Sequence, residues 1–312
     1  MIKVIVVIGP TSVGKTKMGV ELAKKLNGEV ISGDSMQIYQ GMDIGTAKVT
    51  QEEMEGIVHH CVDILKPTET YSVKDFQTTV RHCIEDIISR GKVPIIVGGT
   101  GLYIKAALYD YEFGETNETH LDIQEKYKDK DNDFLYQYLL QIDEKSALEL
   151  HPHNRQRVLR AIQIYEETGH KKSDIISSQQ HVCLYDAYFV GLTLPRDVLY
   201  ERINHRVDVM IKNGLEQEVE KLYHQGLKRE HQSMKAIGYK EWFDYFEYHI
   251  SKEEVYDNIK KHSRQYAKRQ YTWFKNQFDV HWYDVNLTQF YQTVHCVMQD
   301  VQLFLNKKKS QS

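Results

Sequence analysis

The sequence predicts an α/β fold, with a parallel sheet flanked by helices and an all-helical segment inserted into the chain. Two observations lead to this prediction. In the first 110 residues, short apolar runs that end in glycine or polar turns alternate with segments of helical spacing, whereas residues 111–180 show helical spacing and no convincing strand. Alternating strands and helices form parallel sheets, whose ligands bind at the carboxyl ends of the strands. The turns after the strands are therefore the first places to look for a site.

The first part of the chain contains three strand and turn segments. Residues 4–8 are apolar and β-branched, and residues 17–26 behind the next glycine turn carry apolar side chains every four positions, as a helix requires. The segments "EVISGDS" and "KVPIIVGGTG" each combine a strand with a turn, and the helix-like residues 72–91 lie between them. A later run, "LYDAYFVGLTL" from Leu184, is expected to return to the same sheet.

These patterns divide the chain into three parts. We expect residues 1–110 to form the first part of the core, residues 111–187 a helical insertion, and residues 188–312 the completion of the core with mostly helical structure. A chain of 312 residues is long enough for two such lobes.

Composition excludes several classes of protein. Hydrophobic residues make up 41% and charged residues 27%, as in a soluble globular protein, and no apolar stretch is long enough to span a membrane. The four cysteines form no CxxC pair, so neither a zinc ribbon nor a disulfide framework is indicated. Because the N-terminus lacks the features of a secretory signal peptide, we expect a cytoplasmic protein without a membrane partner.

The turn after the first strand has the pattern of a phosphate-binding loop. "GPTSVGKT" matches G-x-x-x-x-G-K-[ST], with a strand before it and a helix after it as the motif requires. Backbone N–H groups and the helix N-terminus can bind phosphate oxygens there, while Lys15 adds a charge and Thr16 can ligate Mg²⁺. We therefore expect a core like that of P-loop NTPases, with the phosphate-binding residues Gly9, Pro10, Thr11, Ser12, Val13, Gly14, Lys15 and Thr16.

The motif leaves the chemistry open, and the next carboxylate must decide it. Asp34 follows the strand "EVISG", where the strand should meet the ligand. In a nucleotide hydrolase it would hold Mg²⁺ through water, in a group transfer it would accept a proton from the nucleophile, and as an exposed turn residue it would only cap the following segment. Position in the sequence does not separate these roles.

The blocks that follow resemble one enzyme family. "DSMQIYQGMDIGTAK" from Asp34, "HHCVDIL" from His59, "YSVKDF" from Tyr71 and "GGTGLY" from Gly98 are similar to the bacterial type of tRNA dimethylallyltransferases, also called tRNA isopentenyltransferases. The resemblance continues in order through "NRQRVLRAIQIYEETG", "RINHRVDVMIKNGLEQEV", "SMKAIGYKE" and "YAKRQYTWF", so it spans nearly the whole chain. The family transfers the dimethylallyl group of dimethylallyl diphosphate to N6 of adenosine-37, just 3′ of the tRNA anticodon.

This resemblance implies a role for the loop and for several side chains. The loop would hold the diphosphate that leaves, together with Mg²⁺ at Thr16, and no phosphate would be transferred. Asp34 would be the base and hydrogen-bond partner of N6, beside a wall for the tRNA that comprises Ser35, Met36 and Gln37. Thr100 would lie near the reacting centre.

Arg202 and Arg206 resemble the arginines that approach the diphosphate from the side opposite the loop. They lie four residues apart on an expected helix and so share one face. We favour Arg206 as the more important of the two.

The resemblance also predicts the surfaces that bind tRNA. In "NRQRVLRAIQIY", apolar residues lie on one helical face and Gln156, Arg157, Arg160 and Gln163 on the other, which suits splayed bases of an anticodon loop. The family's tRNA-contacting segment aligns with Gln156, Arg157, Val158, Leu159 and Arg160, and we add Lys235 and Lys268 as further tRNA contacts. Residues 252–278 carry seven Lys/Arg against three acidic residues, enough to follow RNA phosphates. We expect no protein partner and a monomer.

Three other readings remain open from the residues alone. A P-loop kinase of nucleosides or small metabolites would have a similar loop, carboxylate and arginines. A prenyltransferase acting on free adenine nucleotides would share the catalytic centre, and a nucleic-acid-binding module without catalysis would leave the loop, Asp34 and Thr100 unexplained. The helical insertion with its Arg/Gln face separates the first two readings from tRNA prenylation, because a small acceptor does not need it.

Overall fold

The computed structural model describes residues 1–113, 120–247 and 249–307 of the chain. The chain divides into two compact units, of which the larger comprises Met1–Leu108 with Leu184–Ser312 and the smaller is Tyr109–Cys183. The expected helical insertion, residues 111–187, overlaps the smaller unit almost completely. Leu184 donates a backbone hydrogen bond to Leu108 at 2.8 Å, so the chain leaves and re-enters the larger unit at one point.

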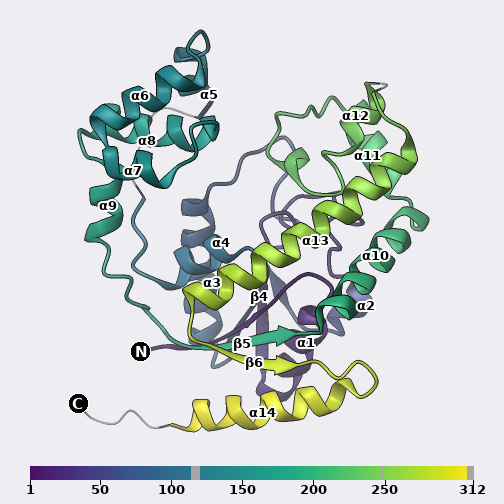
Figure 1. Cartoon of the computed structure of the whole chain (residues 1–312). Helices are drawn as coiled ribbons and strands as arrows, with labels where there is room; N and C mark the ends of the chain where they lie inside the picture. Colours follow the sequence, from purple (N-terminus) through teal and green to yellow (C-terminus); the bar gives the residue numbers. More distant parts are fainter. Residues whose placement is uncertain (114–119, 248, 308–312) are drawn as a thin grey trace. The chain divides into compact units, whose positions relative to one another are not determined.

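The core of the larger unit is a six-stranded parallel sheet (Figure 1). Its order is β3-β2-β4-β1-β5-β6, so the α/β fold predicted from the sequence is confirmed. The strands are β1 (Lys3–Ile8), β2 (Gly28–Gly33), β3 (His59–His60), β4 (Val93–Gly98), β5 (Asp186–Thr193) and β6 (Val280–Asp284).

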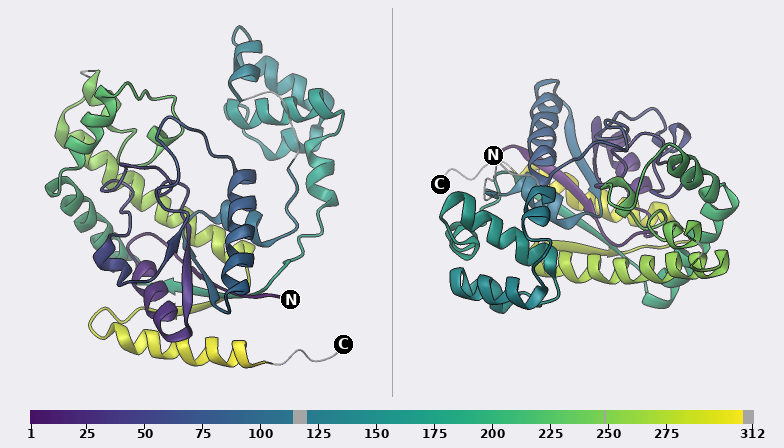
Figure 2. Two further views of the ribbon diagram at one scale, coloured as in Figure 1. Left: turned by 180° about the vertical axis from the view of Figure 1, so that it is seen from behind. Right: turned by 90° about the horizontal axis from the view of Figure 1, so that it is seen from above.

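Helices cover both faces of this sheet (Figure 2). Helices α1 and α14 pack on the face formed by alternate β-strand residues such as Ile5 and Val7, and α3 and α4 pack on the opposite face. Because β1 is covered on both sides, residues 4–8 are fully buried and form a continuous apolar run. The helices of the unit are α1 (Lys15–Leu26), α2 (Gln51–Met54), α3 (Val73–Ser89), α4 (Gly101–Leu108), α10 (Arg196–Lys212), α11 (Leu215–His224), α12 (Trp242–Phe246), α13 (Lys252–Gln277) and α14 (Phe290–Asn306).

The smaller unit is helical in its described part and has its own core. Its helices are α5 (His120–Lys126), α6 (Asn132–Ile142), α7 (Glu144–Glu149), α8 (Arg155–Thr168) and α9 (Lys172–Ser178). Leu135, Leu139, Val158 and Ile162 belong to a cluster of fully buried side chains. Asp143 accepts hydrogen bonds from the backbone N–H groups of Ser146 at 3.1 Å and of residue 173 at 3.0 Å, which ties the start of α7 to α9.

Among the helices of the described ranges, none combines the length and the apolar character needed to cross a membrane.

Candidate active site

The phosphate loop connects β1 to α1 in the larger unit. Gly14 has φ +101°, a left-handed conformation that side chains other than glycine rarely adopt, and it precedes the first residue of α1, Lys15. The loop borders a cavity of about 450 Å³. Arg202, His205 and Arg206 of α10 line the cavity together with Thr11, Ser12 and Gly14–Lys17 of the loop and α1.

Cationic and polar groups converge on this cavity. The Lys15 ammonium donates a hydrogen bond to the carbonyl of Pro10 at 2.7 Å. The pKa of Lys15 is lowered to about 7, mainly by removal of the ammonium from bulk water and also by the nearby Arg206, while Asp34 opposes both effects. The Ser12 hydroxyl is shielded from solvent and has no hydrogen-bond partner among the described residues. A dianion would satisfy these groups, since it supplies both negative charge and acceptor oxygens.

Both arginines of α10 contact the loop. The Arg202 Nε donates to the carbonyl of Ser12 at 3.0 Å, and the Arg206 guanidinium donates to the hydroxyl of Thr11 at 3.4 Å. Arg202 is exposed, whereas Arg206 is half-buried, and this burial lowers the pKa of Arg206. The structure thus places both predicted arginines in the lining of the same cavity as the first turn of α1.

Asp34 and Thr100 lie side by side because β2 and β4 are adjacent strands. Gly33 pairs with Gly98, and the Thr100 hydroxyl accepts a hydrogen bond from the backbone N–H of Ser35 at 3.2 Å. One carboxylate oxygen of Asp34 accepts from the backbone N–H of Met36 at 2.8 Å. Burial raises the pKa of Asp34, and the Met36 hydrogen bond and Lys15 offset only part of this effect.

A second cavity of about 330 Å³ adjoins the first. The two cavities share six lining residues: Thr11, Ser12, Asp34, Thr46, Ala47 and Arg206. Apolar side chains of α10, the segment Lys235–Gly238, and Tyr266 and Arg269 of α13 form other parts of its lining. A carboxylate and a guanidinium therefore lie at the junction between the cavity at the phosphate loop, lined by lysines and arginines, and a mixed apolar and cationic one, which is an arrangement suited to group transfer.

The other predicted contacts of the larger unit fall in different places. Lys235 is exposed and lines the second cavity, while Lys268 is exposed on α13. Ser35 and Met36 line the second cavity. The Gln37 amide is used within the protein, because it donates to the carbonyls of Thr46 and Ala47 and accepts from Ser32. Its direct contact with tRNA stays a prediction.

In the smaller unit, the predicted tRNA-binding segment lies in the first turns of α8. Gln156 and Arg157 are exposed, and Arg160 is half-buried. Val158 and Leu159 are fully buried in the core, so their side chains are not available to RNA, and contact of their backbone with tRNA stays a prediction. Gln163 was expected on the exposed face but is fully buried, where it accepts a hydrogen bond from Arg160 at 3.0 Å.

Gln270 of α13 is a site residue that the sequence analysis missed. It accepts a hydrogen bond from the backbone N–H of Thr11 at 2.9 Å and donates to the carbonyl of Gly99 at 3.0 Å. It thus joins the phosphate loop to the turn that carries Thr100. A signal existed in the sequence, since Gln270 is a polar residue on the otherwise apolar stripe that contains Ala267 and Phe274.

Comparison with known proteins decides the family. The model of a family described as IPP transferase matches residues 37–277, and a second one, described as isopentenyl transferase, matches residues 2–64. The chain belongs to the IPP transferase family. It is 52% identical over 286 residues to a tRNA dimethylallyltransferase of Bacillus cereus (strain AH187), covering 91% of this chain and 90% of the relative.

Solved structures of IPP transferases share the fold of the chain. A tRNA delta(2)-isopentenylpyrophosphate transferase from Staphylococcus epidermidis is 47% identical, with a TM-score of 0.73 over 97% of this chain and 99% of its own. A eukaryotic dimethylallyltransferase acting on tRNA is 32% identical, with a TM-score of 0.86 over 100% of this chain and 82% of its own. As an IPP transferase, the chain is a prenyltransferase enzyme of tRNA modification.

Proposed function

We propose that the chain transfers the dimethylallyl group of dimethylallyl diphosphate to N6 of adenosine-37 in tRNA and releases diphosphate. Beyond membership of the IPP transferase family, one structural observation supports this proposal. The cavity at the phosphate loop, lined by lysines and arginines, adjoins a second cavity, and Asp34 lies at their junction. A donor and an acceptor bound in these two cavities would meet beside a carboxylate.

The first cavity would hold the diphosphate as a leaving group. Lys15, Arg206 and the loop N–H groups would stabilise the negative charge that grows as the bond between the allylic carbon and the diphosphate oxygen breaks. The unpartnered Ser12 hydroxyl supports this, because a diphosphate oxygen would give it an acceptor. No bond to phosphorus would break, so the loop would bind phosphate without transferring it.

Asp34 would position and deprotonate the acceptor amine. As the new bond forms between N6 and the allylic carbon, N6 becomes positively charged and must lose a proton, which the carboxylate of Asp34 would accept. The Met36 N–H and the Ser35–Thr100 contact hold this turn in place. Burial also raises the pKa of Asp34, which makes it a stronger base than an exposed aspartate.

Mg²⁺ would bind in the first cavity, with the protein and the substrate each supplying some of its oxygen ligands. The described residues contain no cluster of three acidic, histidine or cysteine side chains that would hold a metal by themselves. Thr16 lines the cavity with Lys15, and Mg²⁺ commonly binds one or two protein oxygens together with phosphates and water. When bound, it would neutralise diphosphate charge.

The tRNA would contact both units of the chain. Gln156, Arg157 and Arg160 would meet the anticodon stem-loop, and Lys235 and Lys268 would contact its phosphates, as exposed or half-buried positions allow. No protein partner is needed, so we expect a monomer. Because tRNA is the acceptor, we expect the chain to act in the cytoplasm.

Two donors offered in parallel test this function. Purified protein with Mg²⁺ and unmodified tRNA receives labelled dimethylallyl diphosphate in one reaction and γ-labelled ATP in the other. The proposal predicts that only the allylic label enters tRNA, that replacing adenosine-37 by guanosine abolishes the transfer, and that AMP is a poor acceptor. Phosphate transfer from ATP, or preferred prenylation of AMP, would contradict it.

A further inference from the structure

Residues Asp43–Lys48 form a single turn, here called the 43–48 turn, which makes one wall of the second cavity. Its backbone closes through hydrogen bonds from Ala47 to Ile44 at 3.0 Å and from Lys48 to Asp43 at 2.9 Å. Gly45, Thr46 and Ala47 line the cavity that also contains Asp34. The position of this turn therefore affects the space left for the acceptor.

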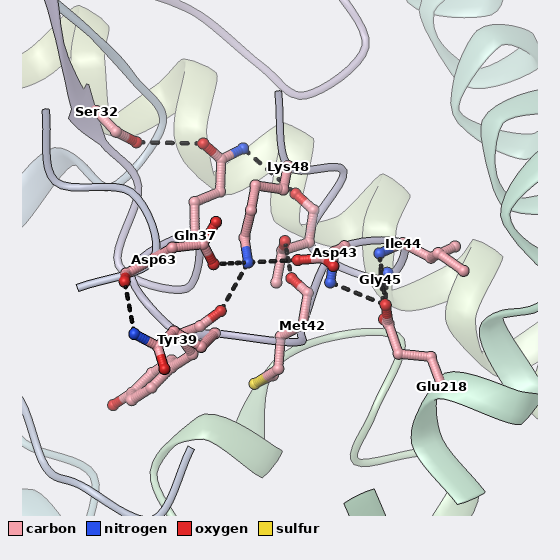
Figure 3. A network of polar contacts seen from close by, with 12 residues as sticks. Ser32, Gln37, Tyr39, Met42, Asp43, Ile44, Gly45, Lys48, Asp63 and Glu218 are labelled. Atoms are coloured by element: carbon pink, nitrogen blue, oxygen red, sulfur yellow. Dashed lines mark hydrogen bonds and ion pairs between the residues drawn. The ribbon is translucent and has the colours of Figure 1, made fainter. Parts of the chain in front are cut away.

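One carboxylate, that of Glu218 on α11, binds the beginning of the 43–48 turn (Figure 3). It accepts hydrogen bonds from three successive backbone N–H groups: Asp43 at 2.9 Å, Ile44 at 2.9 Å and Gly45 at 3.1 Å. The hydroxyl of Tyr239 donates a fourth at 2.5 Å. Hydrogen bonds to an ionised carboxylate are stronger than neutral ones, and N–H groups at the start of a turn favour a negative partner.

Tyr239 also restricts which residue type can occupy position 45 of the turn. Its ring is fully buried, and a Cβ atom at position 45 would lie 2.4 Å from a ring carbon, so only glycine fits there without displacement. Tyr239 directly follows the segment Lys235–Gly238, which lines the same cavity. Glu218 and Tyr239 together therefore connect the 43–48 turn to α11 and to a second cavity wall.

The turn has other supports that do not involve Glu218. Figure 3 shows Gln37 on the side of the turn away from Glu218, and the side chain of Lys48, the last residue of the turn, bonded to Asp43 and to residues outside the turn. The Gln37 amide donates to Ala47 at 3.2 Å, and the buried Lys48 ammonium donates to Tyr39 at 2.7 Å and pairs with Asp43 and Asp63 at 2.5 Å. Loss of Glu218 alone would thus loosen the turn from α11 while its own fold and the rest of the core remain.

We propose that Glu218 is a positioning residue for the acceptor, which holds the 43–48 turn at the distance from α11 that lets adenosine enter beside Asp34. The inference rests on the proposed function, since it assigns the second cavity to the acceptor base. It predicts a larger effect on tRNA than on dimethylallyl diphosphate. Glu218 lines neither cavity, and of the three residues whose N–H groups it binds only Gly45 lines a cavity, which is the second one. Thr46 and Ala47, which border both cavities, are held by the Gln37 amide instead.

Glu218→Gln is the direct test, with Glu220→Gln as its matched control on the exposed side of the same helix. Glutamine keeps the size of the side chain but replaces one acceptor oxygen by an NH₂ group that faces backbone N–H groups. We expect kcat/KM for tRNA to fall about 10- to 100-fold, while the dissociation constant of dimethylallyl diphosphate stays within about threefold. Glu218→Asp, which keeps the charge, should restore part of the loss.

The outcomes separate the inference from the function. If the parent protein and Glu220→Gln transfer the prenyl group and Glu218→Gln has the same kcat/KM for tRNA as the parent, the inference is overturned and the proposed function stands. Equal losses for tRNA and for dimethylallyl diphosphate in Glu218→Gln also overturn the inference, because they would indicate a general structural role. Absence of transfer in the parent protein contradicts the proposed function itself. If Glu218→Gln fails to fold, Tyr239→Phe decides: it removes one of the four donors, and it must lower kcat/KM for tRNA in the same selective way.

Discussion

The surroundings of Lys15 and Arg206 differ from those of ordinary charged side chains at a protein surface. Both are half-buried in one cavity, and the burial of each lowers its pKa. The loop motif predicted that Lys15 would be there, because the motif is local in sequence. The approach of Arg206 from α10 depends on packing between distant segments, so only the resemblance to a family indicated it.

The lowered pKa of Lys15 makes diphosphate binding depend on pH. In the free protein this pKa is about 7, so Lys15 is charged below pH 7 and increasingly neutral above it. Binding a diphosphate favours the charged form, so affinity should fall as pH rises above 7, by up to about tenfold per unit. Isothermal titration with dimethylallyl diphosphate between about pH 6 and about pH 9 checks this.

Lys15→Arg is the control for this titration, because arginine stays charged over the whole range. Its affinity should be nearly flat with pH above 7. An identical fall in the parent protein and in Lys15→Arg would show that another group causes the dependence.

Which helical residues are buried and which are exposed was predicted less well from the sequence than the other features of the chain. Helical spacing put the apolar residues of α8 on one face, and Val158 and Ile162 on that face are buried. It also put Gln163 on the exposed face, because spacing alone does not show that neighbouring helices cover a wider arc. Glu218 gave no signal, since an acidic residue on a helix is ordinary until its backbone partners are known.

At the scale of elements, the strands of the sheet differ in how well the sequence predicts them. The strands β1, β2, β4 and β5 are apolar runs and were predicted within a few residues. β6 was missed because its sequence "VHWYD" is short, partly exposed and lies at the sheet edge, and β3 has only two residues. Central strands are apolar on both faces, whereas edge strands lack this pattern.

Gln270 of α13 is hydrogen-bonded to the phosphate loop and to the turn after β4, so its substitution should weaken the support of the phosphate loop. Gln270→Ala removes the acceptor of the Thr11 N–H and the donor to the Gly99 carbonyl, and each unpaired buried group costs about 1–3 kcal/mol. We expect a lower melting temperature and an affinity for dimethylallyl diphosphate reduced roughly tenfold. Thermal unfolding and titration measure these two effects.

Gln299→Ala on α14 is the matched control, because that side chain is exposed and contacts only His295 in the described contacts. It should change neither quantity. A normal affinity in Gln270→Ala would contradict the assignment of Gln270 as a support of the loop.

For the whole molecule, the division into two units is the feature that we expect to serve a large acceptor such as tRNA. The sequence predicted the helical insertion from its change of composition, and its expected ends lie two and four residues from those of Tyr109–Cys183. Its role in binding tRNA stays a prediction, because helix spacing describes the core of the unit and not its ligand.

Removal of the smaller unit tests that role. A short glycine linker from Leu108 to Leu184 replaces residues 109–183, which is feasible because these two ends are hydrogen-bonded at 2.8 Å. The remaining unit contains both cavities and its own core, so it should fold and bind dimethylallyl diphosphate normally. Its affinity for tRNA should fall at least about tenfold in a fluorescence anisotropy titration. Undiminished tRNA affinity in a folded variant would assign recognition to the larger unit alone.

If prenyl transfer takes place beside Asp34, a single-turnover rate will depend on this carboxylate. Parent protein and Asp34→Asn, each in excess over tRNA and saturated with dimethylallyl diphosphate, are compared for the rate of prenyl transfer. Asparagine keeps the hydrogen bond from Met36 but cannot accept the proton of N6. For Asp34→Asn we expect a rate about 10²- to 10⁴-fold lower, with both substrates still bound. A rate equal to that of the parent protein would contradict transfer beside Asp34.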